Sequence, residues 1–89
     1  MEFRRIYVVK AKDGNKMLIN RTQALKMLKQ CEGARGVIFD FDGIKFLGRA
    51  FAHEVFKAYP ERNPTKSIQF VNVNRNVKSI MHQATSNED

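Results

Sequence analysis

The chain has 89 residues, of which 43% are hydrophobic and 28% are charged, so it suits one globular domain with a modest core. No apolar run approaches the ~18 residues that span a bilayer, and the N-terminal apolar run is too short for a signal peptide, so we expect a cytoplasmic protein. The single cysteine, Cys31, excludes an internal disulfide and a cysteine-based metal cluster.

The net charge of +7 is concentrated in residues 1–35, which contain nine Lys or Arg and three Asp or Glu. Such an excess favours acidic partners, including nucleic acid, although a solvated basic surface is the simpler interpretation. No base-reading motif is recognisable, so any nucleic-acid contacts would be mainly to phosphate. The residues that would make them are Arg4, Arg5, Lys10, Lys12, Lys16, Lys26 and Lys29.

The first third of the chain predicts a hairpin followed by a helix. Alternation over residues 6–11, the tight-turn pair Asp13-Gly14 and a short apolar run over residues 17–19 predict a β-hairpin over residues 4–19. Asn20 is a suitable N-cap for a helix over about residues 21–31. The buried stripe of that helix is expected to be Ala24, Leu25, Leu28 and Cys31.

The remaining residues alternate between strands and helices. The apolar run 37–41 predicts a strand that is buried on both faces. Pro60, Asn63 and Pro64 are expected to break the helix that follows, and Asn74 is expected to cap the last one. The predicted elements are a helix at about 49–59, a strand at 67–73, a helix at about 75–84, and a flexible tail at 85–89.

This order, β-β-α-β-α-β-α, contains no linker and no repeat, so we predict a single domain over residues 1–89. Strands joined through a helix should be parallel with right-handed crossovers. We therefore predict an α/β fold in which a small mixed four-stranded sheet packs with three helices. Crossover helices tend to cover one face of so small a sheet, which leaves apolar surface on the other face. We therefore expect that a homodimer can form through a sheet face or edge.

The sequence Phe39-Asp40-Phe41-Asp42-Gly43 resembles the opening motif of haloacid-dehalogenase-type phosphatases. That resemblance implies that Asp40 is a nucleophile and Asp42 a general acid/base, assisted by Mg²⁺. The later carboxylates do not supply the further metal ligands, because none is expected at the end of a strand: they are Glu54, Glu61, Glu88 and Asp89. We therefore expect no enzymatic activity, no metal and no cofactor. Asp40 is instead expected to accept backbone N–H bonds from the following turn, and Asp42 to shape that turn.

A second resemblance covers about 65 residues. The chain resembles the STAS-like domains of unknown function, which are related to sulfate-transporter and anti-sigma-factor-antagonist STAS domains. The matching residues are Asn20, Arg21 and Ala24, the stretch VIFDFDGIKFLGRAFAHEVF, the strand from Ile68 to Asn74, and Asn76, Val77, Ile80 and Met81.

The resemblance implies a regulatory module that binds proteins, with a histidine-kinase-like ATPase or a sigma-factor regulator as the expected kind of partner. In anti-sigma-factor antagonists a phosphorylated Ser stands at the start of the second helix, and here Arg49 takes that position. We therefore expect docking without a phosphorylatable Ser. For the apolar residues Phe46 and Leu47, packing in the core is as good an explanation as docking. His53 and Glu54 are expected on the polar side of the helix. The proposed docking residues are Asp42, Phe46, Leu47, Arg49, His53 and Glu54.

Overall fold

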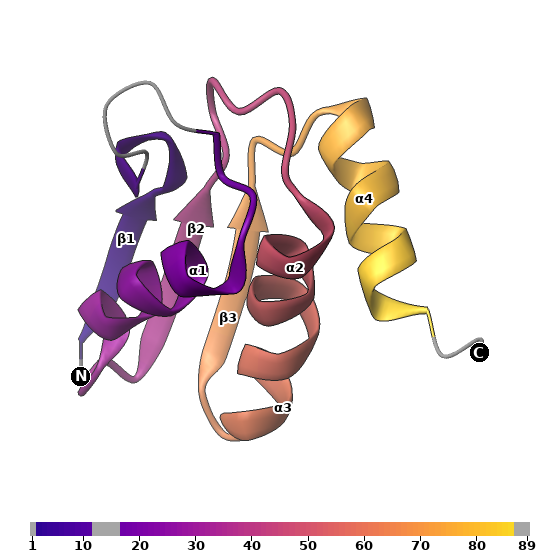
Figure 1. The fold of residues 1–89 in the computed structure, drawn as a ribbon. Coiled ribbons are helices and arrows are strands. Elements are labelled where there is room, and N and C mark those ends of the chain that lie inside the picture. The colour runs from indigo at the N-terminus through magenta and orange to yellow at the C-terminus, as the bar shows by residue number, and fades with distance from the viewer. Residues whose placement is uncertain (1, 12–16, 87–89) are drawn as a thin grey trace.

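The computed structural model describes residues 2–11 and 17–86. In this part of the chain three strands form one sheet, in the order β1-β2-β3, and every pairing is parallel (Figure 1). The strands are β1 (Phe3–Tyr7), β2 (Gly36–Asp40) and β3 (Ser67–Val71). The predicted α/β class is confirmed, whereas a fourth strand and an antiparallel pairing are not present in the described residues.

The helices lie in front of one face of this sheet in Figure 1. Helix α1 (Arg21–Leu28) covers β1 and β2, and a long second helix covers β3. The second helix has three consecutive parts, which are α2 (Arg49–Ala52), a π-helical segment (His53–Ala58) and α3 (Tyr59–Arg62). Helix α4 (Arg75–Thr85) packs against α2 and the π-helical segment at the side of the domain.

The core lies between the sheet and these helices. Ile6, Phe39 and Phe70 occupy one register row across the three strands and point toward the helices. Phe39 is fully buried and its ring stacks on that of Phe70, with the ring centroids 5.8 Å apart. Because side chains alternate along a strand, the neighbouring residues point to the opposite face, which no described helix covers.

The two predicted N-caps are confirmed. The Asn20 side chain accepts a hydrogen bond from the backbone N–H of Gln23 at 2.9 Å, and the Gln23 side chain accepts one from the backbone N–H of Asn20. This reciprocal pair is a capping box, which satisfies two donors at the start of α1. At the start of α4 the Asn74 side chain accepts from Val77 N at 2.8 Å.

The predicted hairpin over residues 4–19 is wrong for the described residues. Strand β1 pairs with β2 in parallel, and residues 17–19 form no strand. The backbone of this segment is instead bonded to the second helix, because Leu18 O accepts from Gly48 N at 2.7 Å and Ile19 O accepts from Phe51 N at 3.3 Å. The expected Asp13-Gly14 turn lies outside the described residues.

Two predicted helix ends are also wrong. Pro60 does not break the second helix, which continues to Arg62 and ends at Asn63, the second of the three predicted breakers. The N–H of Tyr59 bonds to Glu54 O in the π-helical pattern, and Pro60 follows without needing an acceptor, so the missing proline N–H is tolerated there. At the other end, Thr85 belongs to α4 rather than to the tail. Residues 87–89 of the predicted tail lie outside the described residues.

Candidate functional site

The carboxylate of Asp40 closes β2 and organises the turn that follows. Its Oδ1 accepts from Asp42 N at 3.0 Å and from Asn72 Nδ2 at 2.9 Å, and its Oδ2 accepts from Arg5 Nη2 at 2.9 Å. The hydrogen bond from the Asn72 side chain, then the one from Asp42 N, then the one from Arg5, hold the pKa of Asp40 below its usual range. The predicted bond from the turn to Asp40 is confirmed.

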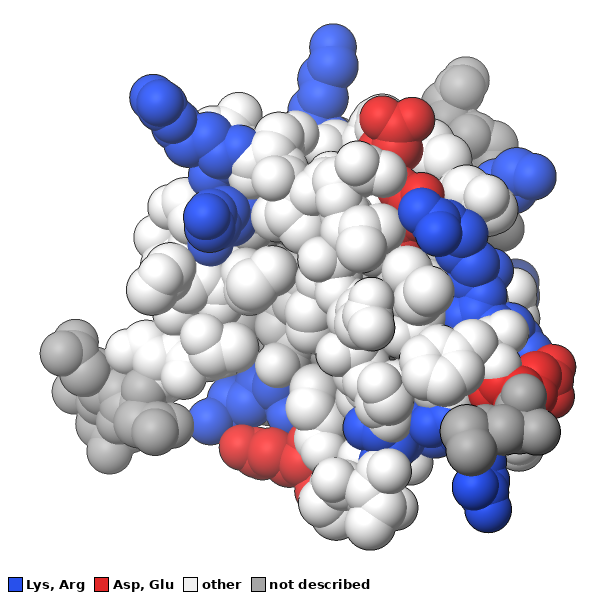
Figure 2. Space-filling view, turned by 180° about the vertical axis from the view of Figure 1, so that it is seen from behind, with Lys and Arg blue, Asp and Glu red and all other residues white. Residues whose placement is uncertain are grey.

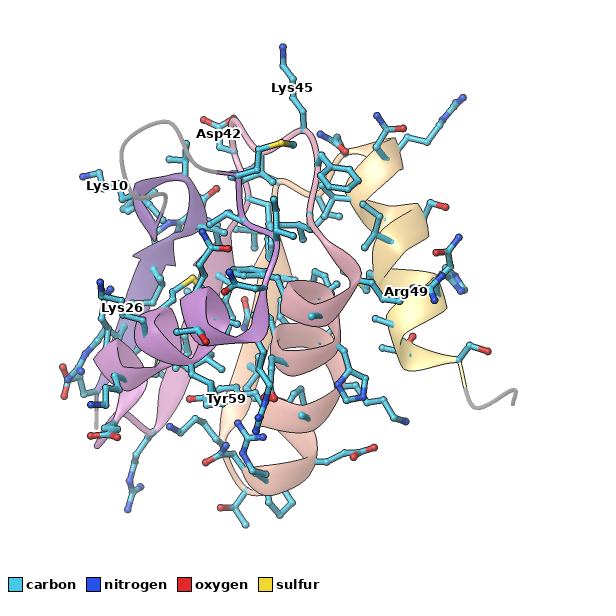
Figure 3. The ribbon with its side chains drawn as sticks, in the orientation of Figure 1. Lys10, Lys26, Asp42, Lys45, Arg49 and Tyr59 are labelled. Atoms are coloured by element: carbon cyan, nitrogen blue, oxygen red, sulfur yellow. The ribbon has the colours of Figure 1, made fainter. Side chains whose placement is uncertain are left out.

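The structure places the two carboxylates of the phosphatase-like motif in different surroundings. Both oxygens of Asp40 are engaged by donors from β1, the turn and the residue after β3, and the side chain is 4% exposed. Asp42 is exposed, and Figure 3 shows it at the top of the turn, beyond the end of β2. Within residues 2–11 and 17–86, no group of three or more His, Cys, Asp or Glu is placed to hold a metal ion.

Two glycines set the shape of the turn for different reasons. Gly43 has φ +84°, a left-handed conformation that side chains disfavour. Gly48 has an ordinary φ of −70°, but a Cβ there would lie 2.6 Å from Ile19 Cα, so it is needed for close approach. With the turn held in this way, Leu47 is buried at 1% exposure, whereas the adjacent Phe46 is 51% exposed. Core filling therefore accounts for Leu47 and does not account for Phe46.

A groove of about 630 Å³ runs between the start of the second helix and α4. Its apolar residues come from both sides, and Arg49, which lies beside α4 in Figure 3, contributes a cation at the first position of α2. The lining among the described residues is Phe46, Leu47, Arg49, Ala52, His53, Lys57, Ile80, Gln83, Ala84 and Ser86. We call this feature the α2–α4 groove.

Four of the six predicted docking residues line this groove, namely Phe46, Leu47, Arg49 and His53. Asp42 and Glu54 do not. The contribution of α4 was not predicted, because Ile80 and Ala84 have the spacing of an ordinary core stripe. Both are only partly buried, so the groove arises where this stripe extends past the core.

The prediction that Glu54 lies on the polar side of its helix is wrong. Glu54 is 3% exposed, and its two carboxylate oxygens each lie 3.3 Å from an arginine nitrogen, Oε2 from Arg21 and Oε1 from Arg62. The π-helical segment widens the turn and changes which residues share a face, so a count based on 3.6 residues per turn misplaces this side chain. His53 is exposed, as predicted.

The predicted nucleic-acid residues do not gather on one surface. Arg4 and Arg5 point to opposite faces of the sheet: Arg4 donates to Gln30 O at 2.6 Å, and Arg5 pairs with Asp40. Lys10 lies by the ring of Tyr7, with Nζ 5.5 Å from its centroid. Lys26 and Lys29 are exposed at α1 and the turn after it, and Lys12 and Lys16 lie outside the described residues.

The fold and the turn together define a class of protein. A parallel sheet with helices on one face, and a strand ending in Asp with a glycine turn into the second helix, describe a small α/β domain. The comparison with protein families finds a match to the STAS-like domain of unknown function over residues 23–78. The match covers more than half of the chain, so the chain belongs to this family.

Comparisons with curated proteins and with solved structures give no match. In the described part of the chain, the helices are too short or too polar to cross a membrane.

Proposed function

We propose that this STAS-like domain is a regulatory module without catalytic activity that binds a partner protein in the α2–α4 groove. The observation that carries the proposal is the convergence of Phe46, Arg49 and His53 with the half-buried stripe of α4 along one groove. The sequence by itself predicts the first three as docking residues. A concave apolar surface with a few polar groups at its margin is the usual form of a binding site.

The exposed Phe46 supports this proposal. An aromatic side chain that is 51% exposed beside a groove gives a partner a large rigid surface to bury, and aromatic and arginine residues are enriched among the strongest contributors to protein interfaces. Arg49 lies close by, at the N-terminus of the helix. The helix dipole disfavours a cation there, so a contribution of Arg49 to binding accounts for its position better than a contribution to folding.

The charges around the groove suggest the chemistry of the partner surface. The charged side chains that line it are Arg49 and Lys57, with the imidazole of His53 between them in sequence, and among residues 2–11 and 17–86 no carboxylate belongs to the lining. Lys57 is also paired with Glu61 at 3.4 Å. A partner surface with acidic residues around an apolar side chain fits this pattern. The family resemblance points to a histidine-kinase-like ATPase or a sigma-factor regulator as the partner, with Arg49 giving a fixed charge where relatives use a phosphorylated Ser.

The test is a titration of the purified native partner with the wild-type domain, Arg49→Glu and Ala84→Trp. Arg49→Glu should weaken binding by roughly 1–3 kcal/mol if Arg49 meets a carboxylate. Ala84→Trp should block the groove, because Ala84 lines it from α4.

Two matched variants serve as controls. Arg75→Glu makes the same charge change at the first position of α4, and Ser79→Trp makes a similar size change at an exposed position of α4 outside the groove. Both controls should bind like the wild type. Equal affinities for all five proteins would show that the partner docks elsewhere, and turnover of a phosphate ester that depends on Asp40 would show that the domain is an enzyme.

A further inference from the structure

We propose that the uncovered face of the sheet binds single-stranded nucleic acid, with bases stacking on Phe3 and Tyr7. This site lies on the opposite side of the sheet from the helices and is separate from the α2–α4 groove. The face carries the outward residues of the three strands, which are Phe3, Arg5, Tyr7, Gly36, Ile38, Asp40, Ser67, Gln69 and Val71. We call it the open sheet face.

Two aromatic rings are exposed on this face, both from β1. Phe3 is 50% exposed and Tyr7 is 46% exposed. A Cβ on Gly36 would overlap the Phe3 ring, so this ring lies directly over Gly36, the residue paired with it in the register. Four residues of strand separate the two rings, which corresponds to about 13 Å along the sheet. Exposed aromatic rings on a sheet are platforms on which proteins stack unpaired bases.

Cations surround the second ring. The guanidinium carbon of Arg5 lies 5.8 Å from the Tyr7 ring centroid, and Lys10 Nζ lies 5.5 Å from it. A nucleotide stacked on Tyr7 would therefore place its phosphate close to positive charge. The carboxylate among the outward residues is that of Asp40, which pairs with Arg5 at 2.9 Å and offsets its charge. The positive charge near Tyr7 that a phosphate would meet therefore comes chiefly from Lys10. A chain with a net charge of +7 adds a general attraction for a polyanion.

The shape of the face favours a thin ligand. Parallel sheets are almost always covered on both faces, so a parallel sheet with helices on one face is incomplete by itself. Three strands of five residues give a surface of roughly 14 Å by 16 Å, well below the ~800 Å² that each partner contributes to a typical protein interface. Figure 2 shows this side of the molecule, with a broad uncharged area in the middle and both basic and acidic groups along its margin. A single strand of a few nucleotides matches that size, and the charge of +7 opposes a second copy of the chain.

The experiment measures fluorescence anisotropy of labelled 12-nucleotide dT and U strands with the full chain at about 50 mM salt. Binding should weaken steeply by about 200 mM salt. Tyr7→Ser and Phe3→Ser should each weaken binding by about 5- to 150-fold, the effect expected for loss of one stacked base. Phe46→Ser removes an aromatic ring of similar exposure (51%) from the α2–α4 groove, and it should bind the strands like the wild type.

A spectroscopic variant separates stacking from general attraction. The chain contains no tryptophan, so Tyr7→Trp introduces a single indole on the open sheet face. This variant should retain binding, and its fluorescence should be quenched by the bound strand. The proposal is overturned if no strand binds at about 50 mM salt, if the serine variants bind like the wild type, or if the indole emission does not change. It is also overturned if sedimentation shows a dimer that Tyr7→Ser dissociates, because the face is then an interface between copies of the chain.

Discussion

The guanidinium of Arg21 in α1 lies 3.3 Å from the buried carboxylate of Glu54 in the π-helical segment. Arg62, from the end of α3, holds the other oxygen of the same carboxylate at the same distance. The arginine side chains are 68% and 49% exposed, whereas that of Glu54 is 4% exposed. The arrangement therefore places one desolvated anion between two cations that remain in contact with water.

This asymmetry predicts a strongly non-additive pair of mutations. Arg21→Ala or Arg62→Ala alone should cost up to about 1 kcal/mol of unfolding free energy, because one partner remains and the removed cation is largely solvated. The double variant leaves a buried carboxylate without a partner and should cost about 3–5 kcal/mol. Urea denaturation of the four proteins measures the coupling.

Glu54→Gln supplies the control for this cycle. In the double-alanine background, replacing the carboxylate with an amide of the same shape should recover stability, because no unpaired charge remains in the interior. Additive losses from the two arginine variants, with no recovery by Glu54→Gln, would contradict the assignment of Glu54 as an anion that depends on both arginines.

The environment of Asp40 predicts a pH dependence of stability. Its pKa is lower in the folded chain than the ordinary value of about 3.9, chiefly because Asn72 donates to it. The folded state therefore binds this proton less readily than the unfolded state. The stabilisation is fully present above the unfolded pKa and is lost as the pH falls through the folded pKa. Asp40→Asn should thus melt below the wild type at neutral pH, and the difference should shrink below about pH 4.

Asn72→Gly tests the cause of that shift. Asn72 has φ +57°, a conformation that glycine adopts readily, so this variant removes the amide donor without forcing a new backbone conformation. The pKa of Asp40, followed by carbon NMR of its carboxyl group, should rise toward the ordinary value. An unchanged pKa would show that Arg5 and Asp42 N are sufficient to hold it low.

The features that the sequence predicts well depend on neighbours in the chain. Asn20 and Asn74 bond to N–H groups three residues away, so their caps are visible as local patterns. The pairing of β1 is not local. Residues 17–19 form a short apolar run that suits a strand, but their backbone bonds go to Gly48 and Phe51, about 30 positions later. Alternation predicts an exposed and a buried side, but it does not identify the partner that the backbone groups bind.

The candidate site also contains features that a local pattern predicts and features that depend on contacts with other elements. Arg49 and His53 were found because they follow a recognisable turn, and both line the α2–α4 groove. Glu54 is buried through the π-helical segment and its two arginine partners, one of which, Arg21, lies 33 residues earlier in the chain. A 3.6-residue period does not reveal either feature. Ile80 shows the same limit, since its spacing indicates burial but does not indicate that the stripe continues into a groove.

Gly48 is predicted to be intolerant of any side chain. A Cβ there would meet the backbone of Ile19, with Ile19 Cα at 2.6 Å, and Gly48 N already bonds to Leu18 O at 2.7 Å. Because backbone cannot move aside as a flexible side chain can, Gly48→Ala should cost about 2–3 kcal/mol in thermal or urea unfolding.

Gly33→Ala is the matched comparison for Gly48→Ala. Gly33 has φ +84°, and a Cβ at this position would have no neighbouring atom within 4 Å in the described part of the chain. Its replacement by alanine is therefore strained only through the backbone conformation, and the cost should be about 1 kcal/mol. A smaller loss for Gly48→Ala than for Gly33→Ala would show that the contact between the turn and residue 19 relaxes easily.

Phe46 and Leu47 are predicted to separate binding from folding. Leu47 is 1% exposed in the core, so Leu47→Ala should cost about 2–5 kcal/mol of unfolding free energy. Phe46 is 51% exposed at the α2–α4 groove, so Phe46→Ala should change the free energy of unfolding by less than about 0.5 kcal/mol. The same variant should bind the native partner more weakly. Urea denaturation and partner titration, done on both variants, measure the two effects independently. If Phe46→Ala unfolds the domain, or leaves partner affinity unchanged while Arg49→Glu reduces it, then the aromatic ring does not belong to the binding surface and Arg49 acts without it.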